Sequence, residues 1–247
     1  MTIPANQNND SQSSNDKQSF LDHIEELRAT LIKCLTAVSL MLIPAFLATP
    51  YLIDALIAWA TPKELSGLAY FSPMEVFVIQ IKFAAVVAVA ASFPYCLWQI
   101  WNFLAPALYE KERKALKLWV SSSVFLFALG SAFCVYFILP LIMKFSASFA
   151  GEHIQPVIGL GNFLSLSGWL ALAFGAMFQF PLAVMIAIRF GIVKRSFLSD
   201  KRPYVIVGIL IISAILTPPD VVSQMLLAAP TYILFEIGLF FSRFFEV

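Results

Sequence analysis

Long runs of residues without a formal charge dominate the chain. They cover 34–53, 83–109, 118–143, 154–188, 203–219 and 221–235. About 20 helical residues are needed to cross the hydrocarbon core of a bilayer, which is roughly 30 Å thick. The first three runs each hold one such helix, and the fourth holds one helix plus a loop around residues 159–162. The pattern predicts an all-α membrane protein.

The last two charge-free runs are shorter than a full span. Tyr204 to Leu216 supplies a helix of only about 20 Å. Pro218, Pro219 and Asp220 follow as a sharp turn, because proline ends one helix and suits the start of the next. The pair is either a re-entrant hairpin or two short spans that thin the bilayer or tilt little. We favour six spans with a short final pair, at about 31–49, 75–103, 115–140, 163–188, 203–216 and 220–241.

Positive charge predicts the orientation of these spans. Of the 16 Lys and Arg residues, only Lys63 and Lys144 fall in loops that would lie outside, and Lys82 lies within the second span. All the others fall in the amino tail, after the second and fourth spans, or at the carboxyl end. Because cytoplasmic segments of membrane proteins are rich in Lys and Arg, both termini are expected to be cytoplasmic.

The amino-terminal segment has a different composition. Residues 1–18 include ten Asn, Gln or Ser residues, which is typical of a disordered, solvated tail. A helix-capping pattern begins at Ser19, and apolar residues then recur at helical spacing over 21–31. This spacing predicts an amphipathic helix on the membrane surface. We therefore expect a tail over 1–18 and a single membrane domain over 19–247.

Composition excludes several classes of protein. The chain is 60% hydrophobic and 13% charged, and this is too little charge to cover a water-facing surface. The net charge of +1 gives no reason to expect a nucleic-acid partner. The two His and three Cys residues have no metal-ligand spacing, and no phosphate-binding loop or nucleophile motif occurs. We expect no catalytic residue, metal or cofactor.

Prolines within the second and fourth spans predict kinks. Pro94 and Pro181 each remove one backbone hydrogen bond. Two long kinked helices beside two short ones suggest a curved wall with a concave face. Gln179 lies deep in the fourth span, two residues before Pro181. Its neutral amide either forms an interhelical hydrogen bond or lines the concave face, and it cannot relay a proton.

Ionisable residues in the apolar zone are functional candidates, because a charge in hydrocarbon is costly. Lys82 follows Glu75 by seven residues, so its ammonium can extend toward that carboxylate. Glu236 precedes Arg243 by the same spacing near the inner surface. Each pair is either functional or a helix-end anchor.

On the cytoplasmic side, Glu26, Arg28 and Glu112 suit a solvated surface by composition alone. Two carboxylates brought together there would bind two guanidinium groups bidentately, and lysine would replace arginine poorly. The sequence also resembles a known family in several motifs. These are residues 23–28, 72–77, 98–109, 112–113, 174–181, 201–204, 217–220 and 223–224.

In these stretches the chain resembles TatC, the multispanning core of the twin-arginine (Sec-independent) protein translocase. The likeness extends in unbroken order from about residue 19 to 244. It implies a cupped six-helix bundle in the bacterial cytoplasmic (inner) membrane. It also implies a receptor for signal peptides with consecutive arginines, which supports proton-motive-force-driven export of folded proteins. The family further implies a hetero-oligomeric complex with the single-span subunits TatA and TatB.

The resemblance assigns expected roles to individual residues. Glu26 and Glu112 fall where the family's arginine-recognising carboxylates lie, with Arg28 and Phe103 in neighbouring motif positions. Asp220 matches the acidic residue of the outer turn that contains Pro218 and Pro219. The family usually has Glu where this chain has Gln179, so a role that needs a titrating group at that depth is not expected here. The alternative function is a secondary transporter or channel for a small solute, suggested by the concave face and the intramembrane polar groups.

Overall fold

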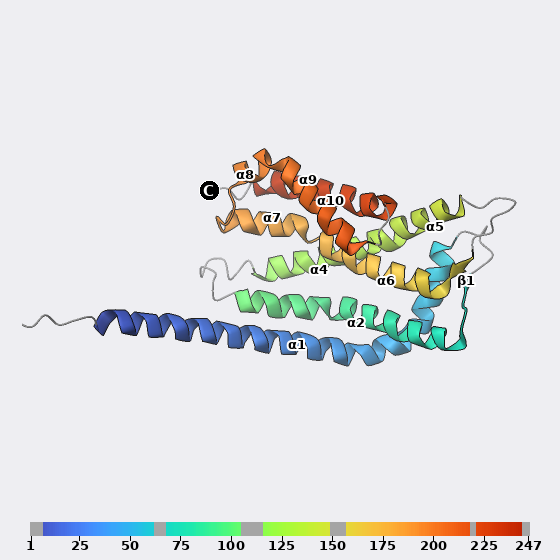
Figure 1. The fold of residues 1–247 in the computed structure, drawn as a ribbon, viewed down its shortest axis with the longest axis horizontal. Coiled ribbons are helices and arrows are strands. Elements are labelled where there is room, and N and C mark those ends of the chain that lie inside the picture. Colours follow the sequence, from blue (N-terminus) through green and yellow to red (C-terminus); the bar gives the residue numbers. More distant parts are fainter. Residues whose placement is uncertain (1–6, 62–67, 105–115, 149–156, 218–220, 244–247) are drawn as a thin grey trace, which may run out of the picture.

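The computed structural model describes residues 7–61, 68–104, 116–148, 157–217 and 221–243. The chain forms an elongated bundle of helices (Figure 1). In chain order the helices are α1 (Gln7–Ala60), α2 (Pro73–Leu104), α4 (Leu116–Phe133), α5 (Leu139–Ala147), α6 (Leu160–Met177), α7 (Phe180–Arg189), α8 (Arg195–Asp200), α9 (Arg202–Leu216) and α10 (Val221–Ser242). A π-helical turn, η2 (Cys134–Ile138), joins α4 to α5. The two-residue strands β1 (Leu68–Ala69) and β2 (Ile158–Gly159) pair in parallel.

Five segments of the described chain are long and apolar enough to cross a membrane. They are Ile24–Ala60, Pro73–Phe103, Leu118–Ala147, Leu160–Arg189 and Val221–Ser242, and the short apolar helix α9 accompanies them. The expected helical membrane architecture is therefore confirmed. Of the final pair, α9 is short, with 15 residues. The sixth helix, α10, has 22 residues, and its bounds agree with the span expected at 220–241.

Helix α1 differs most from the prediction. It begins at Gln7, so the described part of the tail expected to be disordered is helical. It continues to Ala60, eleven residues beyond the expected end of the first span. Residues 21–31 extend the axis of this span and do not form a separate helix lying across it (Figure 1). The final part of α1 turns toward η2, where Trp59 packs edge-on against Tyr136 with ring centroids 5.2 Å apart.

The two predicted kinks have different outcomes. At Pro181 the fourth span divides into α6, which ends at Met177, and α7, which begins at Phe180. The break follows from proline's missing N–H group. Pro94, by contrast, lies inside α2, which continues as one helix from Pro73 to Leu104. The third span also continues farther than expected, through η2 to Ala147.

Glycines allow close contact between the later helices. A Cβ atom on Gly175 would lie 2.5 Å from the ring of Phe127, and one on Gly130 would lie 2.6 Å from the carbonyl oxygen of Phe174. Both contacts are at the crossing of α4 and α6. At Gly238 on α10 a Cβ atom would lie 2.8 Å from the Cα atom of Pro181 on α7. Small residues at such positions let membrane helices approach closely.

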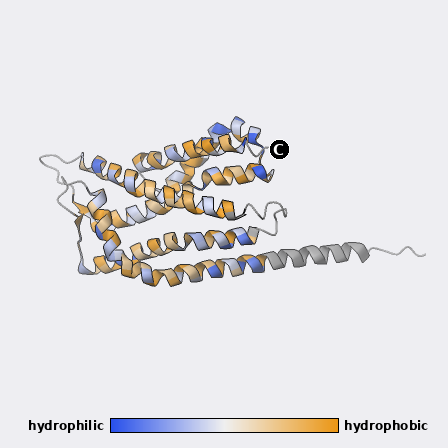
Figure 2. Ribbon diagram, turned by 180° about the vertical axis from the view of Figure 1, so that it is seen from behind, coloured by the Kyte–Doolittle hydropathy of each residue, from blue (hydrophilic) through white to orange (hydrophobic). Residues whose placement is uncertain are grey.

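The two described ends of the chain lie at the same end of the bundle (Figure 1). Hydrophilic residues gather toward this end, while hydrophobic residues cover most of the length (Figure 2). The basic residues Arg189, Lys194, Lys201 and Arg243 belong to the helix ends and short connections found here. By the excess of positive charge, this end is the cytoplasmic one.

The crossing of α4 and α6 provides a test of the fold. We expect Gly175→Ala to lower the thermal unfolding midpoint of the purified protein in detergent by several degrees, because overpacking costs about 1–3 kcal/mol. The ring of Phe127 cannot move away freely, since it is stacked on Phe93 at 3.7 Å between centroids. Gly208→Ala on α9 is the matched control, because no heavy atom lies within 4 Å of the added Cβ. A midpoint that is equal in the two variants would contradict the proposed packing.

Candidate functional site

Helices α1 and α2 bring two of the predicted site residues to one level at the cytoplasmic end. The thiol of Cys34 on α1 contacts the carbonyl oxygen of Cys96 on α2 at 4.0 Å. Glu26 lies eight residues before Cys34, and Phe103 lies seven residues after Cys96. Because the helices are antiparallel, both residues lie about 10–12 Å beyond this contact, in the same direction.

The side chains at this level differ in exposure. Glu26 and Arg28 are exposed on α1, and Phe103 is half-buried in the last turn of α2. Glu26 and Arg28 are two positions apart, so they occupy different sides of the helix. Glu112 lies outside the described residues, so its pairing with Glu26 stays a prediction. Pro218, Pro219 and Asp220 also lie outside the described residues.

An aromatic cluster that the sequence analysis missed joins the ends of α2, α4 and α7. The ring centroids of Trp101 and Trp119 are 5.5 Å apart, and those of Trp119 and Phe190 are 5.7 Å apart. The guanidinium group of Arg189 lies 5.2 Å from the centroid of the Trp119 ring. Tryptophan beside basic residues at span ends is a known interfacial pattern and could have indicated this cluster. The cluster fixes Trp101, two residues before Phe103.

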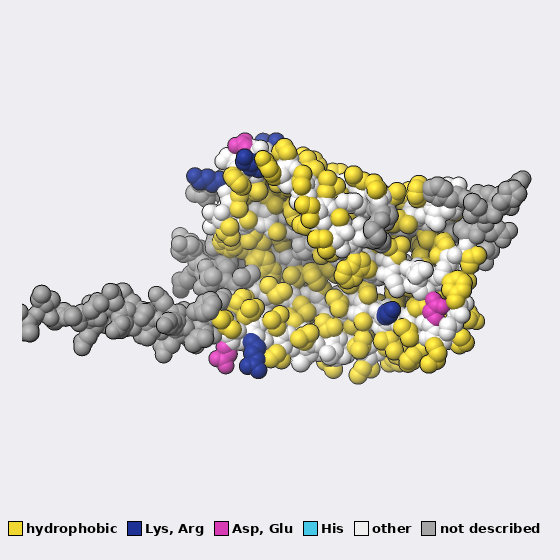
Figure 3. Space-filling view, viewed as in Figure 1, with side chains coloured by type: hydrophobic (Ala, Val, Ile, Leu, Met, Phe, Trp, Pro, Cys, Tyr) yellow, Lys and Arg dark blue, Asp and Glu magenta, His cyan; other side chains and the backbone are white. Residues whose placement is uncertain are grey.

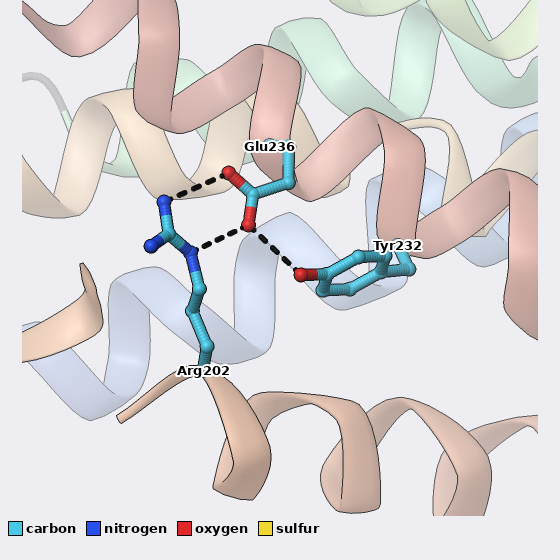
Figure 4. A network of polar contacts seen from close by, with 3 residues as sticks. All are labelled: Arg202, Tyr232 and Glu236. Carbon is cyan, nitrogen blue, oxygen red and sulfur yellow. Dashed lines mark hydrogen bonds and ion pairs between the residues drawn. The ribbon is translucent and has the colours of Figure 1, made fainter. Parts of the chain in front are cut away.

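A charged network also lies between α9 and α10 (Figure 4). The guanidinium group of Arg202 donates to both carboxylate oxygens of Glu236, at 2.7 and 3.1 Å. The hydroxyl of Tyr232 donates to the same carboxylate at 3.0 Å. Glu236 thus pairs with Arg202, and the guanidinium group of Arg243 lies over Phe240. The bidentate geometry neutralises the carboxylate near the cytoplasmic end of α10.

Gln179 connects two helices. Its side-chain amide donates to the carbonyl oxygen of Ser123 on α4 at 3.0 Å, and more weakly to that of Gly175 at 3.5 Å. It lies between α6 and α7, next to the break before Pro181. Of the two roles left open by the sequence, the interhelical hydrogen bond is present in the structure.

The carboxylate of Glu75 binds a backbone group and not Lys82, the partner that the seven-residue spacing suggested. It accepts a hydrogen bond from the backbone N–H of Phe71 at 2.8 Å. Within the described part of the chain, no ion pair joins it to Lys82. In the same part of the chain, no group of three or more His, Cys, Asp or Glu residues could hold a metal ion. At the cytoplasmic end, the groups described above that could bind a ligand are carboxylates, guanidinium groups and aromatic rings.

Comparisons with known proteins agree with one family. A family model described as Sec-independent protein translocase protein (TatC) matches residues 22–230. The chain is 38% identical over 236 residues to the TatC protein of Escherichia coli K12, covering 93% of this chain and 90% of that protein. It is 32% identical to the TatCy protein of Bacillus subtilis, covering 92% of this chain and 89% of that one.

A solved structure gives the same result for the fold. The crystal structure of a twin-arginine translocase receptor, TatC, superposes with a TM-score of 0.81 and 31% sequence identity. The match covers 90% of this chain and 98% of that chain. Since the family model and these relatives extend over nearly the whole length, the chain belongs to the TatC family, the membrane-embedded receptors of the twin-arginine, or Sec-independent, protein translocase.

Proposed function

We propose that the cytoplasmic end of α1 and α2 binds the consecutive arginines of twin-arginine signal peptides, with Glu26 and Glu112 as the carboxylate partners. The observation that supports this most directly is the common level of Glu26 and Phe103 beside the Cys34–Cys96 contact. An exposed carboxylate and an aromatic ring at one level can together bind a guanidinium group, by charge and by stacking.

Chain connectivity is compatible with the second carboxylate lying nearby. Glu112 is four residues before Leu116 in the sequence, and four residues span at most about 14 Å. Leu116 begins α4, whose first turns contact the end of α2 through Trp119 and Trp101. A peptide that is bound to Glu26 and reaches the end of α2 would therefore come near the start of α4, four residues after Glu112 in the sequence.

In this proposal the chain is a binding and transport component and not an enzyme. The folded protein attached to the signal peptide would be exported at the expense of the proton-motive force. The relatives reported above are protein translocases, which favours protein transport over the transport of a small solute. The place of action would be the bacterial cytoplasmic membrane, with the charged end of the bundle on the inside.

The small single-span subunits TatA and TatB are the proposed partners in the complex. Two small or polar residues of α9 and α10 are used within the chain: Ser213 is buried, and Gln224 donates to the carbonyl oxygen of Leu210 at 3.1 Å. Gly208 on α9, in contrast, has no heavy atom within 4 Å of the position that a Cβ atom would occupy. This open position on a short helix leaves room for a partner helix to approach.

Binding of a synthetic twin-arginine signal peptide to the purified full chain in lipid nanodiscs tests the recognition pair. We expect Glu26→Gln and Glu112→Gln each to weaken binding by roughly ten- to a hundredfold, because a hydrogen bond to a charged group contributes about 1.5–3 kcal/mol. Fluorescence anisotropy of a labelled peptide gives the affinity. A twin-lysine peptide should bind the unmodified chain weakly.

The chain offers a matched control for each carboxylate. Glu25 adjoins Glu26 and is also exposed on α1, and Glu110 lies two residues before Glu112. The changes Glu25→Gln and Glu110→Gln remove the same charge, and we expect both to leave peptide affinity near that of the unmodified chain. Equal losses of peptide affinity in all four variants would instead indicate a general effect of negative charge. That result would contradict the assignment of Glu26 and Glu112 as specific partners.

We further propose that Gln179 acts as a neutral connection between helices and not as a titrating group. Its amide N–H is the donor to Ser123, and a carboxylate at this position would present an oxygen to the carbonyl oxygen of Ser123. The family's usual Glu would therefore not reproduce this contact in ionised form. Gln179 can therefore form a hydrogen bond between helices without placing a charge in the membrane.

Two substitutions separate these roles. We expect Gln179→Leu to lower the thermal unfolding midpoint slightly, because an interhelical hydrogen bond in a membrane contributes about 0.6–2 kcal/mol. Gln179→Glu should lower it at least as much at neutral pH, because two acceptors face each other. Export of a twin-arginine reporter in cells checks function in parallel. Normal stability and export in both variants would show that the position only packs.

A further inference from the structure

A hollow on the outer half of the bundle contains a lysine with no protein partner among the described residues. The hollow has a volume of about 750 Å³ and lies between α2 and α6, with the end of α9 at its edge. Lys82 lines it and is exposed. In the part of the chain that the structure describes, no hydrogen bond or ion pair holds its ammonium group. Figure 3 shows this face, where a basic side chain (dark blue) lies among hydrophobic side chains, well away from the charged end.

Two polar side chains of α6 line the same hollow. Asn162 and Ser165 are three residues apart, so they share one side of the helix, and both are exposed. Within the described chain, neither side chain has a hydrogen-bond partner. The other walls are mostly apolar and include Phe83, Leu166 and Trp169. These three donors, set among apolar walls and without partners in the described chain, are available to a polar group from outside the protein.

The depth of the hollow follows from the helices around it. Lys82 lies nine residues after Pro73, and Trp169 lies nine residues after Leu160, so each is about 14 Å inside the outer end of its helix. The indole N–H of Trp169 donates to the carbonyl oxygen of Leu216, the last residue of α9, at 2.6 Å. The short helix α9 therefore ends about level with Lys82.

This match in level indicates what the hollow can hold. Hydrocarbon thickness adjusts to the length of the adjacent helix, so lipid beside the short α9 has its headgroups near Leu216 and not at the outer ends of α2 and α6. Tryptophan at membrane–water interfaces is consistent with this level. A headgroup there meets the ammonium of Lys82, and its acyl chains lie along the apolar walls.

We propose that this hollow is a binding site for an anionic phospholipid of the outer leaflet. The lipid phosphate accepts hydrogen bonds from Lys82, Asn162 and Ser165, and its net negative charge neutralises Lys82. The lipid completes the wall of α2 and α6 where α9 is too short to cover it. This site is independent of the proposed peptide-binding surface at the opposite end.

Native mass spectrometry of the purified full chain tests the proposal. The protein is titrated with phosphatidylglycerol and, separately, with phosphatidylcholine carrying the same acyl chains. We expect the unmodified chain to bind phosphatidylglycerol more tightly. Lys82→Gln should reduce this preference by about fivefold, the effect of one basic residue on anionic lipid. Asn162→Leu should give a smaller reduction.

Two lysine variants make the test specific. Lys82→Arg keeps the positive charge and should retain the preference. Lys144→Gln removes an exposed basic residue of α5, outside the hollow, and should also retain it. Thermal unfolding of each variant checks that the fold is intact. A preference for phosphatidylglycerol that is equal in the unmodified chain and Lys82→Gln, or absent from the unmodified chain, would overturn the proposal.

Discussion

The cost of leaving a polar group unsatisfied in hydrocarbon is the constraint that shapes the bundle. The hydroxyl groups of Thr49, Thr217 and Thr231 each donate to the carbonyl oxygen four residues earlier in the same helix. Such bonds satisfy a hydroxyl without an interhelical partner. Longer polar side chains connect helices instead, as Gln179 does to Ser123 and Gln224 does to Leu210.

The same constraint explains the ion pair between Arg202 and Glu236. Glu236 lies in α10 among apolar residues, where an unpaired carboxylate would be costly. The first residue of α9 supplies the guanidinium group, and Tyr232 adds a hydrogen bond from one turn before Glu236.

Much of the architecture could be predicted because each feature has a local cause. Charge-free runs indicate spans, and the distribution of Lys and Arg indicates the cytoplasmic end. The break before Pro181 follows from the missing N–H of proline. The continuous course of α2 through Pro94 shows the limit of that reasoning, because neighbouring contacts decide whether a helix tolerates proline.

The features that the sequence did not indicate depend on tertiary contacts. The partner of Glu236 is Arg202, which α9 brings close and which no spacing along α10 could indicate. The part of α1 beyond the predicted span packs against η2 through Trp59 and Tyr136. For the candidate site, the resemblance to the family indicated Glu26 and Phe103, and the Cys34–Cys96 contact explains their common level. The aromatic cluster around Trp119 required the positions of three helices.

Electrostatics at the cytoplasmic end limits where a doubly cationic peptide can bind. The carboxylate of Glu236 is already held by Arg202. Asp200 is followed directly by Lys201 and Arg202, and Lys194 begins the same short segment, so this corner repels cations. Exposed Glu25 and Glu26 lie on the other side of the bundle, on α1, with only Arg28 and Lys33 in the next two turns. In the proposal made above, a peptide with two guanidinium groups would be attracted to the Glu25 and Glu26 carboxylates on α1 and repelled from the corner formed by Lys194, Lys201 and Arg202.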